Sequence, residues 1–136
     1  MIDLPPSPYM TLATADAEGV PWATPVWYAT EDGRHFYWVS DPNARHSRNI
    51  AQRPEIAIVI FDSTVAPGDA DAIYLAARAE PVGTDGIEIF NRVGAAQGLE
   101  QWGAERVTAP AKHRLYRATV TEAFRLGAGD TRVPLA

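Results

Sequence analysis

The sequence predicts a mainly β protein with short helices, arranged as a closed antiparallel barrel in the order β-β-β-α-β-β-α-β. Six short segments rich in apolar, β-branched or aromatic residues follow one another along 136 residues, a length that fits one domain. Tight turns at 16–19 and 31–33 join the first three segments. Short strands joined mainly by tight turns favour antiparallel pairing and barrel closure over a parallel sheet.

The first half of the chain begins with residues 1–8, which hold three prolines and are expected to form an irregular N-terminal arm. Strands are expected at 9–15, 21–29 and 34–39, the third dominated by aromatic residues. Pro21 and Pro25 remove backbone donors from the second strand, so we expect that strand at an edge of the sheet.

A helix is expected over 41–52. Asp41 suits an N-cap, Pro42 suits the first helical position, and Pro54 stops the helix after Gln52. The small or apolar residues Ala44, Ser47, Ile50 and Ala51 would share one face, opposite Arg45, Arg48, Asn49 and Gln52.

The second half continues with 55–61, an almost continuous apolar run expected to form a strand buried on both faces. A fifth strand is expected at 72–81, a second helix at 83–98 and a sixth strand at 113–124. The expected barrel domain therefore covers 9–124, and 125–136 is expected to be a C-terminal tail.

Composition narrows the function classes. The net charge is −5, with eleven arginines and a single lysine, which disfavours a general nucleic-acid binder. Cysteine is absent, and the three histidines show no metal-ligand spacing, so no metal site is expected. No run is long and apolar enough to span a membrane, and the N-terminus lacks the pattern of a signal peptide. A cytoplasmic location is expected.

Positive charge is concentrated in one short segment of this acidic chain. Arg45, His46, Arg48 and Arg53 lie between Asp41 and Glu55 with no acidic residue among them. Cationic side chains beside a strand-to-helix turn suggest a site for an anion, most economically a phosphate. The alternative is a solvated helix face with no ligand.

The order of these motifs resembles a known family. The runs LATADAEGVPWATPVWYAT, HFYWVS and RPEIAIVIF around the basic helix, with weaker support from HRLYRATVTEAF, look like the flavin-binding split β-barrel of the pyridoxamine 5′-phosphate oxidase superfamily. The resemblance implies a six-stranded split barrel that forms a homodimer with two flavins at the subunit interface. It implies FMN as the first choice of cofactor and the deazaflavin F420 as the second.

The resemblance also implies positions for the cofactor. The second strand would line the flavin ring with Thr24, Pro25, Val26 and Trp27. The phosphate would lie at Ala44, Arg45 and His46, with Ser40 just upstream. This chain departs from the family pattern because Ala44 replaces a serine, His46 replaces a lysine and Pro25 lacks a backbone N–H. The superfamily also has haem-handling members, so the cofactor stays open.

Other residues receive weaker assignments. Trp102 and Arg117 are expected near the dimer interface, where Arg117 would reach the partner's cofactor. Asn49 is expected to bond the backbone of a neighbouring loop, and Asp62 to cap a loop. The histidines His35 and His113 are expected to be structural.

The leading function hypothesis is a flavin-type oxidoreductase that exchanges hydride with a small organic substrate, with no catalytic protein residue. The long C-terminal portion of true pyridoxamine phosphate oxidases is missing, so that particular activity is not expected. One alternative is a non-catalytic flavin or haem carrier. Another is a small oligonucleotide-binding barrel, which the acidic charge disfavours.

Overall fold

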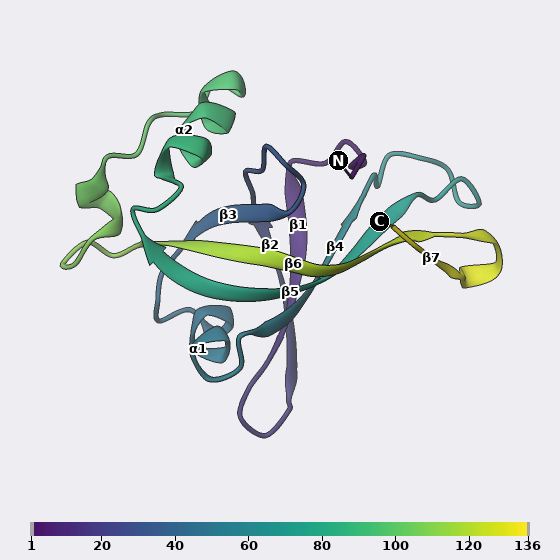
Figure 1. Cartoon of the computed structure of the whole chain (residues 1–136), viewed down its shortest axis with the longest axis horizontal. Coiled ribbons are helices and arrows are strands. Elements are labelled where there is room, and N and C mark those ends of the chain that lie inside the picture. Colours follow the sequence, from purple (N-terminus) through teal and green to yellow (C-terminus); the bar gives the residue numbers. More distant parts are fainter. Residues whose placement is uncertain (1, 136) are drawn as a thin grey trace.

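A computed structural model describes residues 2–135 (Figure 1). The strands are β1 (Tyr9–Ala15), β2 (Pro21–Trp27), β3 (His35–Ser40), β4 (Glu55–Phe61), β5 (Ala72–Gly83), β6 (Arg114–Leu126) and β7 (Arg132–Pro134). The helices are α1 (Arg45–Gln52) and α2 (Ile87–Ala96), with short 3₁₀ turns at Ala104–Val107 and Ala128–Asp130. The mainly β architecture expected from the sequence is confirmed.

The strands form one curled antiparallel sheet in the order β2-β1-β4-β5-β6-β3, with β7 paired to β6. An isolated bridge between Ala29 and Tyr37, with two backbone hydrogen bonds of 2.9 Å, links the chain after β2 to β3. The sheet thereby curls into a split barrel, and Figure 1 shows the long β5 and β6 crossing it. The two prolines of β2 lie on an edge strand, as expected.

The core lies on the inner face of the curled sheet. Met10 and Leu12 of β1, Ile58 and Ile60 of β4, and Trp38 of β3 are almost fully buried there. The expectation that β4 is buried on both faces is wrong, because its residues alternate and Phe61 is 47% exposed. A continuous apolar run in the sequence does not show what covers the second face of the strand. In this chain the second face of β4 is partly exposed.

Helix α1 starts at Arg45, later than the sequence suggested, and Ala44 takes the N-cap position without a side-chain cap. The Asp41 carboxylate accepts the N–H of Asn43 at 2.8 Å, and its carbonyl accepts the N–H of Ala44 at 3.0 Å. Aspartate readily makes such local turns, and here the turn delays the helix.

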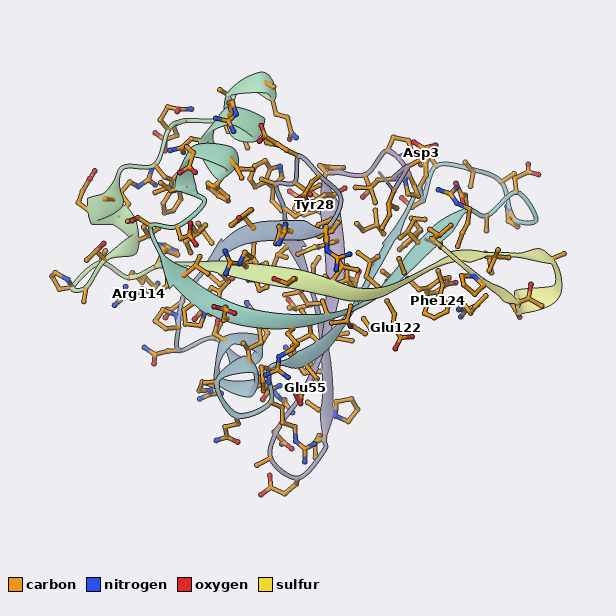
Figure 2. All side chains as sticks on the ribbon, in the orientation of Figure 1. Asp3, Tyr28, Glu55, Arg114, Glu122 and Phe124 are labelled. Carbon is orange, nitrogen blue, oxygen red and sulfur yellow. The ribbon has the colours of Figure 1, made fainter. Side chains whose placement is uncertain are left out.

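The barrel also extends beyond the expected boundary at its C-terminal side. Strand β6 continues to Leu126 and the chain turns back as β7, so 125–135 is not a free tail. The N–H of Leu135 bonds the carbonyl of Ala123 at 2.8 Å, and Leu135 packs on the core with Ile2 and Leu4. Arg125 bonds the Asp71 carboxylate and the carbonyl of Asp3, which Figure 2 labels.

Between β5 and β6 the chain makes an excursion that we call the arch, residues 84–113, which contains α2 and the first 3₁₀ turn. In Figure 1 it is the green segment that extends from the ends of β5 and β6. Gly86 allows the arch to pack closely against β3. Its φ is +86°, and a Cβ there would lie 2.1 Å from Cε1 of Tyr37. No helix within residues 2–135 has the length and apolar character needed to cross a membrane.

Candidate functional site

A cleft of about 500 Å³ lies between the barrel and the arch. Its barrel wall is made by Pro25, Val26, Trp27, Val39, Ser40 and His46, and its arch wall by Phe90, Gly94, Leu99, Glu100, Trp102 and His113. Most of these side chains are apolar or aromatic, and the volume falls within the range of small-molecule sites. The cleft can therefore enclose a flat organic ring.

The polar end of the barrel wall is formed by Ser40 at the end of β3 and His46 in the first turn of α1. Their Oγ and Nε2 atoms are 2.8 Å apart. Burial lowers the pKa of His46 below its ordinary value, so the imidazole is neutral at neutral pH. The first N–H groups of α1 lie beside this pair and have no side-chain cap. This end offers hydrogen-bond donors to an anion without a fixed positive charge.

Trp27 connects the barrel wall to the arch. Its indole N–H donates to Oε1 of Gln97 at 2.9 Å. Its ring meets Phe90 edge-on, with centroids 5.1 Å apart and planes at 89°. Because the indole donor is already engaged, Trp27 presents an apolar surface to the cleft.

Trp102 continues the aromatic lining on the arch. The Asn91 side chain accepts the N–H of Trp102 and donates to its carbonyl, both at 2.8 Å. Arg106 stacks over the Trp102 ring at 3.6 Å from its centroid. Arg114, labelled in Figure 2 where the arch joins β6, donates to the carbonyls of Ala111 and His113 at 2.6 Å. Hydrogen bonds and a cation–π contact within the arch, together with Arg114 of β6, therefore hold the segments around Trp102 and His113 in place.

Five of the eight cofactor-site residues proposed from the sequence line this cleft, namely Pro25, Val26, Trp27, Ser40 and His46. Thr24, Ala44 and Arg45 do not. The Arg45 guanidinium lies over the Trp22 ring instead, 4.3 Å from its centroid. The basic segment is thus divided, since His46 lines the cleft and Arg45 lies against Trp22 of β2.

Backbone hydrogen bonds tie the neighbouring turn to this region. The carboxylate of Asp16 accepts the N–H groups of Val20 and Glu18, and with nearby Arg45 these lower its pKa against the opposing effect of burial. Arg53 donates to the carbonyl of Ala17 at 2.9 Å. Arg53 therefore braces the turn between β1 and β2.

Several sequence-based assignments need correction or extension. Asn49 bonds the Thr14 hydroxyl at 3.0 Å inside the α1–β1 contact, not a loop backbone. Asp62 does cap its loop through the N–H and hydroxyl of Thr64. Arg117 pairs with Asp85 at 3.0 Å and is not a lining residue, while its reach to a partner's cofactor stays a prediction.

The arch wall of the cleft was not predicted from the sequence. The helical period placed Phe90 on an apolar helix face, and His113 was assigned only a structural role. Their approach to β2 depends on how α2 docks, which local periodicity does not encode. Within residues 2–135, no group of three His, Asp or Glu side chains is placed to hold a metal ion.

Comparison with known proteins decides the family. Residues 3–126 match the sequence model described as pyridoxamine 5′-phosphate oxidase. The chain belongs to this family. A search of curated protein sequences returned no match.

Solved structures similar to this family member share its fold. HutZ, a haem storage protein from Vibrio cholerae, is 24% identical with a TM-score of 0.65, over 86% of this chain and 84% of HutZ. A haem-binding protein from Mycobacterium smegmatis is 24% identical with a TM-score of 0.72, over 96% of this chain but 53% of that protein. An F420 reductase is 18% identical with a TM-score of 0.61, over 85% and 87%. The chain thus spans about half the length of the mycobacterial protein.

Proposed function

We propose that this family member binds a flavin-type cofactor, FMN first and F420 second, and acts as an oxidoreductase on a small organic substrate. The observation that carries this proposal is the aromatic-lined cleft whose polar end combines Ser40, His46 and the uncapped start of α1. A flat ring with an anionic tail has the matching distribution of apolar and polar surface. Membership of the family supports the same choice.

In this proposal the barrel wall holds the ring. Pro25, Val26 and Trp27 contact one face of it, and neighbouring Thr24 continues the strand. Ser40, His46 and the first N–H groups of α1 receive the phosphate, next to Ala44 at the N-cap. Arg45 reaches the same phosphate only by leaving Trp22. A flavin-type ring supplies two-electron hydride transfer, so the protein residues bind, orient and exclude water.

A homodimer is part of the proposal, because the outer face of the sheet carries exposed apolar residues. Tyr9 and Phe61 are 56% and 47% exposed. Next to them on the same face, Thr11 pairs with Val59 and Ala13 pairs with Ala57 across β1 and β4. Exposed apolar residues of this kind favour pairing with a second copy of the chain. A cytoplasmic location and the absence of a nucleic-acid partner stay predictions.

Haem binding without turnover is the second candidate. His46 and His113 line the same cleft, and a neutral imidazole is a common iron ligand. Two structural neighbours are named as haem-storage or haem-binding proteins. Both candidates require the cleft, and they differ in which side chains meet the ligand's centre.

Purification from a host that makes F420, followed by mass spectrometry of the released small molecule, tests both candidates. We expect FMN or F420 at close to one molecule per chain, together with a flavin or deazaflavin absorption band. Haem with a Soret band that His113→Ala shifts would favour the second candidate. Protein that binds none of FMN, F420 or haem when each is added would contradict both.

A further inference from the structure

The two walls of the cleft have different chemistry, and this difference bears on the substrate. We infer that the arch selects an uncharged planar aromatic substrate, stacked against Phe90 and Trp102, and that Asn91 is the positioning residue for that surface. The inference rests on the proposed function, in which the barrel wall holds the cofactor ring. The arch wall then faces the open side of the ring, where a substrate must lie.

The aromatic side chains of the arch wall meet at right angles. The Phe90 and Trp102 rings have centroids 6.2 Å apart and planes at 90°. Trp102 and His113 are 5.6 Å apart at 88°. A corner of perpendicular rings accepts a flat ring that stacks on one member and meets the other edge-on, both of which are favoured aromatic contacts. A bulky non-planar molecule cannot make both contacts.

The charges of the arch wall are balanced at its rim. Glu100 is the only carboxylate among the arch-wall residues, and its Oε1 lies 3.8 Å from Nη1 of Arg106. Arg106 in turn lies over the Trp102 ring. A charged substrate would lose hydration against the apolar wall, and the exposed Glu100 and Arg106 side chains at the rim would compensate little of that loss. An uncharged ring loses nothing comparable.

Asn91 fixes the place of Trp102 without lining the cleft. Its amide bonds both the N–H and the carbonyl of Trp102, and its own carbonyl accepts a hydrogen bond from Gln101 at 3.1 Å. Replacement by aspartate keeps the size and the acceptor, but turns an oxygen toward the Trp102 carbonyl. The indole would then lose its fixed position while the barrel stays intact.

Three ligands that share the naphthalene ring system and differ in charge test the inference. They are naphthalene-2-carboxamide, naphthalene-2-carboxylate and naphthalene-2-carboxamidine, which are neutral, anionic and cationic. Calorimetric titration of the purified protein with its bound cofactor should show the carboxamide binding at least tenfold more tightly than either charged ligand. Trp102→Leu should weaken carboxamide binding at least tenfold, and Trp102→Phe should restore much of it. Asn91→Asp should weaken it severalfold, whereas Gln52→Glu, which adds the same charge on α1, should not.

Equal binding of the three ligands, or tightest binding of the carboxylate, would overturn the inference. So would a Trp102→Leu protein that folds and binds like the parent. If Trp102→Leu fails to fold, the three-ligand series and Asn91→Asp decide the question. Cofactor content is measured on the same samples by absorption. A bound cofactor with no preference among the ligands rejects only the inference, whereas failure to bind any flavin rejects the proposed function.

Discussion

The hydroxyl of Ser40 lies 2.8 Å from Nε2 of His46, and both side chains face the cleft. Ser40 ends β3 and His46 lies in the first turn of α1, so the pair marks the junction of strand and helix. Because burial lowers the pKa of His46, this junction is uncharged at neutral pH. Positive charge appears there only when the imidazole takes up a proton.

Cofactor binding should therefore depend on pH through His46. A bound phosphate would favour the protonated imidazole and raise its pKa, so affinity should increase as the pH falls from 7.5 toward 6. Titration of FMN or F420 by fluorescence at each pH measures this. His46→Gln should show a flatter dependence of affinity on pH. The dependence that remains in this variant measures titration of the phosphate itself. An identical slope of affinity against pH in the parent and in His46→Gln would mean that His46 does not interact with the phosphate.

Stability without ligand should change with pH in the opposite sense. The folded protein holds the pKa of His46 below the 6.5 of the unfolded chain, so below that value the unfolded state takes up more protons. The His46 contribution to stability is complete above about 6.5 and is lost as the pH falls toward the folded-state pKa. Urea unfolding at pH 7.5 and 5.5 should show a smaller loss for His46→Gln than for the parent.

Gly86→Ala should destabilise the fold more than Gly19→Ala. Both glycines have positive φ, +86° and +84°, so alanine costs about 1 kcal/mol of backbone strain at either position. A Cβ at residue 86 also collides with the Tyr37 ring, whereas at residue 19 nothing lies within 4 Å. Overpacking adds about 1–3 kcal/mol. Thermal unfolding of the two variants gives the difference, and equal melting temperatures would mean that Tyr37 moves freely aside.

Arg45→Ala should weaken cofactor binding about fivefold. A charged hydrogen bond to phosphate contributes about 2 kcal/mol, but the guanidinium must first leave Trp22, which costs about 1 kcal/mol. The net loss is then about 1 kcal/mol, or roughly fivefold in affinity. Arg34→Ala, which removes an exposed arginine that does not line the cleft, is the control and should bind like the parent. Unchanged affinity in Arg45→Ala would assign the phosphate to Ser40, His46 and the helix alone.

Phe61→Glu should convert a dimer into a monomer. Phe61 lies exposed on the outer face of the sheet, where a carboxylate would be buried without a partner in the paired state. Light scattering with size-exclusion chromatography measures the mass. Val133→Glu is the control, because Val133 is similarly exposed but lies on β7. A parent protein that is monomeric with its cofactor bound would reject the shared site.

Strand positions were predictable from the sequence because alternation and turn residues are local signals. β1 and β4 were placed to the residue, and Pro25 marked an edge strand. The start of α1 was misplaced because Asp41 serves equally well as a helix cap or a turn residue, and only the backbone path chooses between them. The barrel wall followed from resemblance. Phe90 meets Trp27 and Trp102 through tertiary docking, for which the sequence carries no spacing signal.

The edge position of β2 limits how two copies of the chain can associate. Pro21 and Pro25 have no N–H to offer along the open side of that strand, so another strand added there would leave carbonyl groups unmatched. Continuous sheets that run through the β2 edge from one subunit into the next, and fibrous aggregates that grow by the same addition, are thereby disfavoured. Association through side chains on the broad face of the sheet stays open.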